Sequence, residues 1–455
     1  MSFSAAYLRE VLEACVPAGA TGLMVAVSGG GDSASLLIAV AALGAVFRSL
    51  PVRAVHVDHG LQAAAGHFRD SCAALCGRLN VPLTIIPVVV ELPAGVSVEA
   101  AARDARYAAL AAELRPGECV LTAHHREDQA ETLLLQALRG AGLKGMSAMP
   151  VCTPFAGGWH VRPALDVTQA ALLEFGAGAG APSDAAASVC CSAADPMNND
   201  LRYDRVYLRR EVWPLIESRW PGAGGALSRA ARHVAQAQNL LEAAAAADVA
   251  RLRDGEALSV SGLRALTPEA RINAVRYWLG EAGVESPSAA RVTEALRQVF
   301  DAAADHLPAV VWGDHALRRY RQRLFLTAAQ PPRLTGLRAW PVHPDSRVEL
   351  GFGVGALRWV EQSGGIAARR LPATLEVRSR KGGETLKHAR QGRTQSVQHL
   401  CQSLGILPWL REALPLVFAG DALIAVADLW LAAYWCADPG APGLGIIWEG
   451  APIIV

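Results

Sequence analysis

The chain has 455 residues, of which 52% are hydrophobic and 19% charged, so it has enough apolar material for two or three domains with buried cores. Its net charge of +1 is too small to indicate a nucleic-acid partner by itself. No apolar run reaches the roughly 18 to 20 residues that span a bilayer, and the N-terminal stretch lacks a signal-peptide layout. We therefore expect a cytoplasmic protein that makes no membrane contact.

Nine cysteines are spread along the chain without a CxxC pair, which argues against a zinc ribbon or a dithiol redox motif. We expect them to be reduced thiols. Cys72 and Cys76 lie four residues apart on a predicted helix, and we interpret them as small core residues.

The stretch from Gly22 to Val40 predicts a buried strand at Leu23–Val27 and the start of an apolar helix at Ala34–Val40. Consecutive glycines between them allow a sharp turn and the close approach of a bulky anion. The helix directs its free N–H groups and its positive end to the same point. We interpret this segment as a phosphate-binding loop, the alternative being that Asp32 or Ser33 only caps the helix. The residues of the loop are Ser28, Gly29, Gly30, Gly31, Asp32 and Ser33.

The loop differs from two common phosphate-binding motifs. It has neither the Lys-Ser or Lys-Thr pair of a Walker loop nor the GxGxxG spacing of a dinucleotide site. The motif here is a strand followed by SGGGDS and then a helix. It resembles the PP-loop of the ATP pyrophosphatase superfamily. This resemblance implies splitting of ATP into AMP and pyrophosphate to activate a carbonyl-like oxygen.

Strands and helices alternate after this loop, which predicts an α/β domain with a doubly wound, parallel, Rossmann-like sheet. Ligands of such sheets bind at the carboxyl ends of the strands. Asp58 and His59 fall at one such end, although polar residues there are also common turn formers. The predicted elements are a strand at 51–60, a helix at 67–79, a strand at 83–90, a helix around 99–107, a strand at 118–122 and a helix after it.

Arg103 and Arg106 are three residues apart on a predicted helix and so share a face. Two guanidinium groups on one face are suited to binding a phosphate. An ordinary solvated face with Asp104 as counter-charge is the alternative, and spacing alone favours it.

The segment that follows the fourth strand places an imidazole and two carboxylates on one helix face, because His124, Asp128 and Glu131 are spaced four and three residues apart. A zinc site needs three ligands on compatible faces, and the adjacent pair His124 and His125 does not supply them. We favour instead a role for Asp128 and Glu131 in holding a substrate ammonium group.

Further motifs follow SGGGDS in order, and together they resemble the tRNA(Ile)-lysidine synthetase family over the first half of the chain. Two features depart from the family pattern: residues 173–194, predicted to form a loop because they are rich in Gly, Ala and Ser, and Val206, which replaces the Asn of a YDRN motif. Both bear on the geometry near Arg205. The motifs are HVDHG, EAAARDARY, TAHHREDQAETLLL, RGAGLKGM, RPALD and DPMNNDLRYDRVYLRREVWPLI.

Composition and motifs predict three domains: a PP-loop domain at 1–217, a helical domain at 222–330 and a small, basic α+β domain at 370–450. The resemblance implies that the first is catalytic and that the other two bind tRNA. A Pro-rich linker separates the last two. Residues 369–412 hold nine Arg or Lys against three Glu, a local balance of 9 − 3 = +6, and such surfaces commonly contact a phosphate backbone. The C-terminal part also resembles the C-terminal domain of the same family.

The resemblance implies a reaction in which ATP adenylates the oxygen on carbon 2 of the wobble cytidine of CAU-anticodon tRNA(Ile), with loss of pyrophosphate, and free lysine then attacks carbon 2 and displaces AMP. It implies that the loop 28–33 binds ATP with Mg²⁺, with Asp32 as a protein ligand and as a catalytic residue. It also implies roles for further side chains: Arg103 and Arg106 at the α-phosphate or adenylated base, His124 or His125 in proton transfer, Asp128 and Glu131 in lysine binding, and Arg205, together with Arg378, Lys387 and Arg393 of the basic region, in tRNA binding.

Two other classes of function remain open at this point. Another PP-loop tRNA-modifying enzyme, such as a thiolase, would need paired cysteines or an iron–sulfur motif, and the chain has no CxxC. A non-catalytic RNA-binding protein with a relic nucleotide fold would tolerate loss of Asp32. The sequence implies no protein partner.

Overall fold

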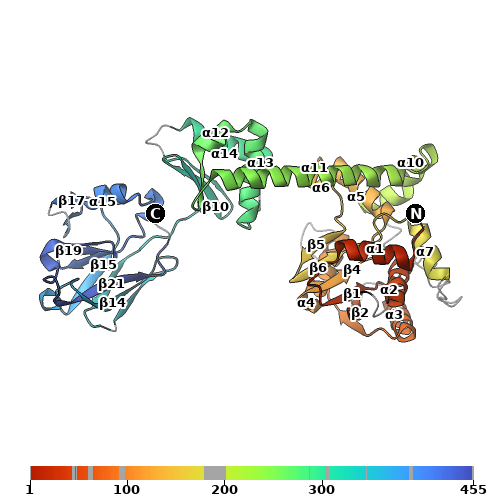
Figure 1. Cartoon of the computed structure of the whole chain (residues 1–455), viewed down its shortest axis with the longest axis horizontal. Coiled ribbons are helices and arrows are strands. Elements are labelled where there is room, and N and C mark those ends of the chain that lie inside the picture. The colour runs from red at the N-terminus through yellow and green to blue at the C-terminus, as the bar shows by residue number, and fades with distance from the viewer. Residues whose placement is uncertain are drawn as a thin grey trace. The chain divides into compact units, whose positions relative to one another are not determined.

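A computed structural model describes residues 2–43, 47, 49–59, 65–91, 98–178, 201–285, 287–302, 307–344, 346–388 and 393–452. The chain divides into two compact units, Met1–Leu241 and Glu242–Val455 (Figure 1). We describe each unit by itself. The finer domain boundaries, 1–217, 222–330 and 370–450, stay a prediction.

The first unit contains a six-stranded sheet and the helices around it. Its elements are α1 (Ala5–Cys15), β1 (Gly22–Ala26), α2 (Gly31–Leu43), β2 (Val52–Asp58), α3 (Ala65–Leu79), β3 (Leu83–Pro87), α4 (Val98–Glu113), β4 (Glu118–Leu121), α5 (Arg126–Leu138), α6 (Leu143–Met146), β5 (Cys152–Phe155), β6 (Gly158–Val161), α7 (Gln169–Gly178), α9 (Asp204–Tyr207), the π-helical turn η4 (Leu208–Val212), α10 (Trp213–Arg219) and most of α11 (Ala223–Leu252).

The strand order of this sheet is β3-β2-β1-β4-β6-β5. β1 lies between β2 and β4 and pairs parallel with both, while β2–β3 and β4–β6 are also parallel. Only β5, at the edge, runs antiparallel to its neighbour. The predicted parallel sheet is therefore confirmed, and the carboxyl ends of β1, β2, β4 and β6 meet at one edge.

Helices cover both faces of the sheet, as the term doubly wound requires. Leu23 and Val25 of β1 pack in one core with buried residues of α1, α2, α3 and α7. Met24 points to the other face, where it packs against Leu110 of α4 and Val120 of β4. This alternation follows from the two-residue period of a strand, and Figure 1 shows α2 and α4 on opposite sides of β1.

Cys72 and Cys76 of α3 belong to the first of these cores, as predicted, and both are buried free thiols. Burial raises the pKa of Cys72 to about 12 and that of Cys76 to about 11. Both thiols therefore stay protonated and behave as small hydrophobic groups.

The predicted loop at 173–194 is wrong at its start, because α7 continues to Gly178. Glycine is used here for packing rather than for turning: a Cβ on Gly176 would lie 2.1 Å from the Ser35 hydroxyl of α2. The two helices approach closely only because that Cβ is missing. The rest of the predicted loop, from residue 179 onward, lies outside the described residues.

The second unit begins within α11, and its described residues form several helices and four antiparallel sheets. Its further elements are β7 (Arg253–Asp254), β8 (Ala257–Ser259), α12 (Val260–Ala265), α13 (Pro268–Glu281), α14 (Ala289–Asp301), β9 (Ala309–Trp312), β10 (His315–Tyr320), β11 (Arg323–Ala328), β12 (Leu337–Pro341), β13 (Arg347–Gly351), β14 (Gly355–Ser363), η5 (Ala368–Arg370), β15 (Thr374–Arg378), β16 (Thr385–Lys387), β17 (Thr394–Ser396), α15 (Val397–Leu404), η6 (Pro408–Leu410), β18 (Leu416–Ala419), β19 (Ala422–Val426), β20 (Trp430–Leu431), η7 (Ala433–Trp435) and β21 (Pro442–Glu449).

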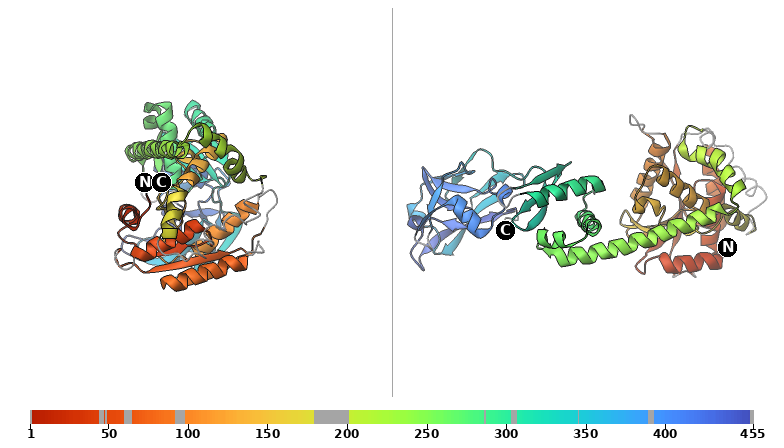
Figure 2. Two further views of the ribbon diagram at one scale, coloured as in Figure 1. Left: turned by 90° about the vertical axis from the view of Figure 1, so that its right-hand side faces the viewer. Right: turned by 90° about the horizontal axis from the view of Figure 1, so that it is seen from above.

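The sequence predicts one long helical stretch from Leu227 to Asp254, and the 30-residue helix α11 confirms it (Figure 2). Arg229, Arg232 and Glu242 are among the charged residues along its length. Among the described helices, none combines the length and the apolar character needed to cross a membrane.

The predicted helical region is confirmed in α11 to α14, but it also carries a five-stranded sheet, β7-β8-β11-β10-β9. The sequence pattern at 310–312 and 316–327 predicts a small hairpin around Gly313 and Asp314, but 316–327 is in fact two antiparallel strands, β10 and β11. The chain reverses between them at Arg321, whose φ of +54° is unusual for a residue with a Cβ. Because no Gly, Pro or Asn stands at 321–322, the usual turn signal is missing.

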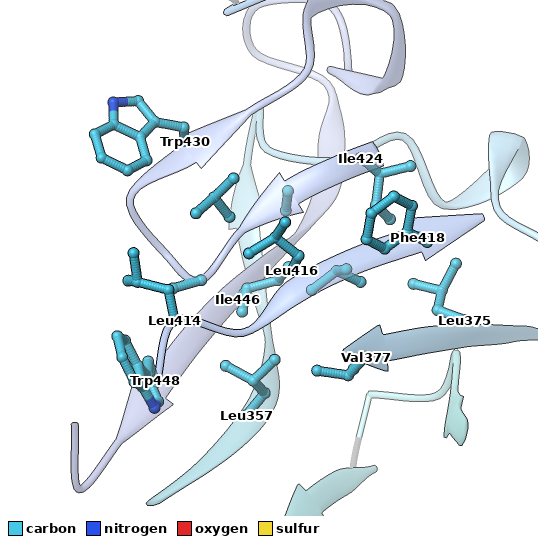
Figure 3. Packing of buried hydrophobic residues seen from close by; sticks show 14 of the residues in the cluster. Leu357, Leu375, Val377, Leu414, Leu416, Phe418, Ile424, Trp430, Ile446 and Trp448 are labelled. Atoms are coloured by element: carbon cyan, nitrogen blue, oxygen red, sulfur yellow. The ribbon is translucent and has the colours of Figure 1, made fainter. Parts of the chain in front are cut away.

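The C-terminal part of the second unit is an α+β structure, as predicted. One core joins the five-stranded sheet β12-β15-β18-β19-β20 to the three-stranded sheet β13-β14-β21. Figure 3 shows Leu375 and Val377 of β15 close to Leu416 and Phe418 of β18, with Trp448 of β21 in the same core.

A buried ion pair ties the amino ends of β2 and β4 together at the edge opposite the phosphate-binding loop. Arg53 donates to the two carboxylate oxygens of Glu118 at 2.9 and 2.7 Å and to Glu113 at 2.6 Å. Burial raises the pKa of the Glu118 carboxyl, but the bonds from Arg53 outweigh this, so the net pKa is lowered.

We expect Glu118→Gln to lower the free energy of unfolding by about 3 kcal/mol, because it leaves the buried Arg53 guanidinium with one fewer counter-charge. Chemical denaturation at neutral pH measures the change. Glu13→Gln is the matched control: it breaks an exposed pair with Arg9 and should cost less than about 1 kcal/mol. Equal effects of the two variants would contradict the role of burial.

Candidate functional site

The loop after β1 has the geometry expected of an anion-binding turn. The Ser33 hydroxyl accepts from the Ser28 backbone N–H at 3.1 Å and donates to the Gly30 carbonyl at 3.0 Å. Gly29 has φ +86°, and a Cβ there would lie 2.8 Å from Phe68 of α3. The loop is therefore held closed by its own serines and requires glycine at 29. It presents the first N–H groups of α2 at the carboxyl edge of the sheet.

Asp32, in the first turn of α2, is held by a residue from α7. The Gln169 side-chain amide donates to both Asp32 carboxylate oxygens, at 3.0 and 3.2 Å. Burial raises the pKa of Asp32, and the charge of His125 and the bond from Gln169 only partly offset this, so the net pKa is raised. The structure thus places Asp32 at the loop in a defined orientation.

His125 lies among three carboxylates. Its Nδ1 is 2.9 Å from Glu127 Oε2, and its Nε2 is 3.4 Å from Asp128 Oδ2 and 3.9 Å from Asp32 Oδ2. Burial lowers the pKa of His125, but the bond to Glu127 and the charges of Asp128 and Asp32 outweigh it, so the net pKa is raised. The Gln169 backbone N–H donates to the same Glu127 oxygen at 3.0 Å, which closes a ring of contacts around the loop.

Asp128 and Glu131 lie side by side on α5, as predicted, and both are nearly buried. The prediction that His124 shares their helix face is wrong, because α5 begins only at Arg126. Two arginines from α9 and η4 contact them. Arg205 donates to Asp128 at 2.8 Å and to Glu131 at 3.0 Å. Arg209 donates to Glu131 at 2.7 and 2.9 Å and to Asp128 at 3.1 Å. The carboxylate pair is thus part of a four-residue charge cluster.

Arg103 and Arg106 share a face of α4, as predicted, and both guanidinium groups lie over the Tyr107 ring, at 5.1 and 5.7 Å. Burial, together with the charges of Arg103 and Arg205, lowers the pKa of Arg106. Within the part of the chain that the structure describes, neither Arg103 nor Arg106 makes an ion pair with a carboxylate. Arg106 and Arg103 therefore provide positive charge available to an anion.

His124 differs sharply from its neighbour His125. Its Nδ1 is 2.8 Å from the Thr122 hydroxyl, which is also 2.8 Å from His160 Nε2. Burial lowers the pKa of His124 to about 3, and burial lowers that of His160 to the same value. At neutral pH His124 is uncharged, whereas the carboxylates favour the charged form of His125.

The predicted residues of the C-terminal region lie on β15, on β16 and just before β17. Arg378 is half-buried, with its guanidinium 3.8 Å from the centre of the Phe418 ring and 3.9 Å from Glu376. Lys387 and Arg393 are exposed. Lys387 and Arg393 are therefore open to a ligand, while Arg378 is engaged in an intramolecular contact.

Several site residues were not singled out from the sequence. Arg209 lies four residues after Arg205, so helical spacing was a usable signal. Thr122 and Gln169 gave no signal, because a lone Thr or Gln after a strand or at a helix start is common. His160 and Arg162 come from β6 and the residue after it, and only the pairing of β6 with β4 brings them to Thr122.

Comparisons with known families cover most of the chain. A model described as a PP-loop domain matches residues 4–216. Models described as a TilS substrate binding domain and a TilS substrate C-terminal domain match residues 258–325 and 375–448. The first match includes every part of the site around the loop.

Three similar relatives are each named tRNA(Ile)-lysidine synthase. That of Alkalilimnicola ehrlichii is 40% identical, covering 92% of either chain. That of Xanthomonas axonopodis pv. citri is 38% identical, covering 89% of either chain. That of Pseudomonas putida is 37% identical, covering 89% of this chain and 92% of its own.

The position of His125 predicts an effect of Glu127→Gln on its titration. Since the wild-type pKa is raised, the stabilisation from protonated His125 is present below its ordinary pKa of about 6.5 and is lost as pH rises through the raised value. Without the Glu127 charge the pKa should fall, which histidine NMR titration measures. Glu174→Gln, at an exposed position of α7, is the control. Identical midpoints in wild type and Glu127→Gln would contradict the assignment.

Proposed function

Since this chain belongs to the tRNA(Ile)-lysidine synthase family, we propose that it uses ATP to join lysine to carbon 2 of the wobble cytidine in tRNA(Ile) with a CAU anticodon. The chain is an ATP-using ligase with a PP-loop domain. Formation of lysidine changes the codon that the tRNA reads and the amino acid that it accepts. We propose that the protein is cytoplasmic, because its tRNA substrate is found there.

One observation supports this proposal most: a phosphate-binding loop and a buried carboxylate pair lie at the same edge of one sheet. Asp128 contacts His125, which in turn lies near Asp32 of the loop. ATP phosphates and an amine nucleophile would therefore meet within a short distance. A thiolase would instead need a sulfur carrier, and the family to which this chain belongs transfers an amino acid.

In the first step, N–H groups of the loop 28–33 would bind the ATP phosphates, and O2 of the cytidine attacks the α-phosphate with loss of pyrophosphate. The base must be unstacked for this attack. Arg103 and Arg106 supply positive charge for the α-phosphate, because neither makes an ion pair with a carboxylate among the described residues.

In the second step, the lysine ε-amine attacks carbon 2, the C2–O2 bond breaks, and AMP leaves with the oxygen. We propose that Asp128 and Glu131 bind ammonium groups of lysine. Because Arg205 and Arg209 contact the same carboxylates, the arginines are suited to receive the α-carboxylate of lysine while the acids take a cationic group. Binding then rearranges an existing charge cluster instead of burying new charge.

Mg²⁺ fits the loop, because a single carboxylate together with phosphate oxygens is a typical magnesium donor set. Asp32 would be the protein ligand, and its carboxylate is already oriented by Gln169. When bound, the ion would neutralise charge on the departing pyrophosphate.

Regions 222–330 and 370–450 are proposed to hold the tRNA, while the first domain carries out the chemistry. The exposed Lys387 and Arg393 and the cation Arg378 belong to the +6 segment. Contacts of this kind are made mainly to the phosphate backbone and so depend on salt.

The activity is tested with purified full-length chain, ATP, radiolabelled L-lysine and an unmodified CAU-anticodon tRNA(Ile) transcript. We expect AMP and tRNA-bound lysine in equal amounts. Asp32→Asn should lower the rate at least about 100-fold through lost charge at the loop. Asp70→Asn, whose side chain is 76% exposed, is the control. Absence of both products in wild type would defeat the proposal, and tRNA binding without AMP formation would favour a non-catalytic RNA-binding protein.

The C-terminal surface is tested by changing Arg378, Lys387 and Arg393 together to Ala. We expect weaker tRNA binding and a smaller dependence of log K on log salt, by about 0.7 to 0.9 for each lost phosphate contact. Titrations at several salt concentrations measure both. The matched control removes three ion-paired arginines, Arg333, Arg347 and Arg358, and should change the slope less. Unchanged affinity of the first variant at moderate salt would remove this surface from the proposal.

A further inference from the structure

A chain of four polar side chains lies at the carboxyl ends of β4 and β6. The Arg162 guanidinium is 2.9 Å from His160 Nδ1, His160 Nε2 is 2.8 Å from the Thr122 hydroxyl, and that hydroxyl is 2.8 Å from His124 Nδ1. Arg162 and His160 are buried, and the chain ends at His124, one residue before His125.

The direction of every hydrogen bond in this chain follows from its first member. A guanidinium group only donates, so His160 Nδ1 accepts and the proton of a neutral His160 is on Nε2. His160 Nε2–H therefore donates to the Thr122 oxygen. The Thr122 hydroxyl has no third side-chain or backbone partner within the described ranges, so its own hydrogen points to His124. His124 Nδ1 is then an acceptor, and its ring proton is on Nε2.

Burial keeps His124 in this neutral form. The nearby Asp128 carboxylate favours an imidazolium, but the charges of Arg162, Arg205 and Arg106 oppose it. A donor chain that ends on Nδ1 also occupies the atom that would otherwise take up a proton. A neutral imidazole with Nε2–H is a hydrogen-bond donor toward the site and has no free lone pair to act as a base.

We propose that His124 donates a hydrogen bond from Nε2–H to the oxygen on carbon 2 of the target base, and that Thr122, His160 and Arg162 are positioning residues that set its tautomer. In the part of the chain that the structure describes, no group bonds to His124 Nε2, so this donor is available to a ligand. No proton moves in the interaction, because the N–H bond stays intact. The identity of the acceptor rests on the proposed function, whereas the tautomer does not.

This role differs from proton transfer by His124 or His125. A donor aimed at the C2 oxygen polarises the base while it is adenylated. It also stabilises charge on the same oxygen as that oxygen leaves with AMP. Removing one such donor typically costs about 10²- to 10³-fold in rate.

The tautomer is tested first, on the full-length chain labelled with ¹⁵N-histidine and with no substrate present. His124→Gln assigns the signals. We expect His124 and His160 in the Nε2–H form, neutral from about pH 6 to 8. Thr122→Val, which removes the hydroxyl but keeps the shape, should release the tautomer of His124, and Thr122→Ser should retain it. An Nδ1–H form of His124 in wild type, or titration of His124 near neutral pH, would overturn the inference.

Turnover measurements then show whether His124 acts as a hydrogen-bond donor or as a base. Glutamine places an N–H near the position of Nε2–H but cannot take up a proton, so His124→Gln should keep at least about tenfold more activity than His124→Ala. A base would lose as much in His124→Gln as in His124→Ala, and that result, with both variants folded, would overturn the donor role. Thr122→Val should lower kcat and leave the KM for ATP unchanged, whereas Thr122→Ser should restore kcat.

Thr293→Val is the matched control, because Thr293 of α14 is exposed and, among the described residues, its hydroxyl bonds to the Ala289 carbonyl alone. It should leave turnover unchanged. If wild type transfers no lysine at all, the proposed function fails, but the NMR measurement still decides the tautomer. The two failures are therefore distinguishable.

Discussion

The site depends on one constraint, the left-handed turn at Gly29. That turn lets the chain leave β1 and enter α2 at once, so the positive end of α2 points to the carboxyl edge of the sheet. Phe68 of α3 packs against the bare Cα, which leaves no room for a Cβ. A side chain at this position would displace the loop and break the bonds that Ser28 and Ser33 make within it. The other site residues would then no longer surround a phosphate-binding turn.

Around this turn, charged side chains hold neighbouring elements in place and are also suited to binding substrate. Glu127 contacts both His125 and the α7 backbone, and Gln169 of α7 holds Asp32. The loop, α5 and α7 are thus linked by bonds between groups that are themselves suited to binding substrate. Such a network is favourable only while every member has a partner. We infer that binding of substrate exchanges partners within the network rather than leaving any charge unpaired.

Adjacent histidines show how the fold separates two identical side chains. His125 is the N-cap residue of α5 and faces carboxylates, which raise its pKa despite burial. His124 precedes it and faces Thr122, and burial together with nearby arginines keeps it neutral. The two rings therefore offer different chemistry at neutral pH, although they are consecutive in the chain.

The sequence by itself determined the parallel sheet, the loop at 28–33 and the family, because these depend on local periodicity and on contiguous motifs. It also placed Asp128 and Glu131 side by side, since helical spacing does so. It did not reveal that Arg209 joins them, that Gln169 holds Asp32, or that α7 extends through glycines to Gly178. The contacts of Arg209 and Gln169 join residues far apart in the chain, so only tertiary packing brings them together. The extension of α7 likewise depends on its packing against α2, where Gly176 lies against Ser35. The difference between His124 and His125 was decided in the same way, because a pKa and a tautomer depend on which neighbours the fold supplies.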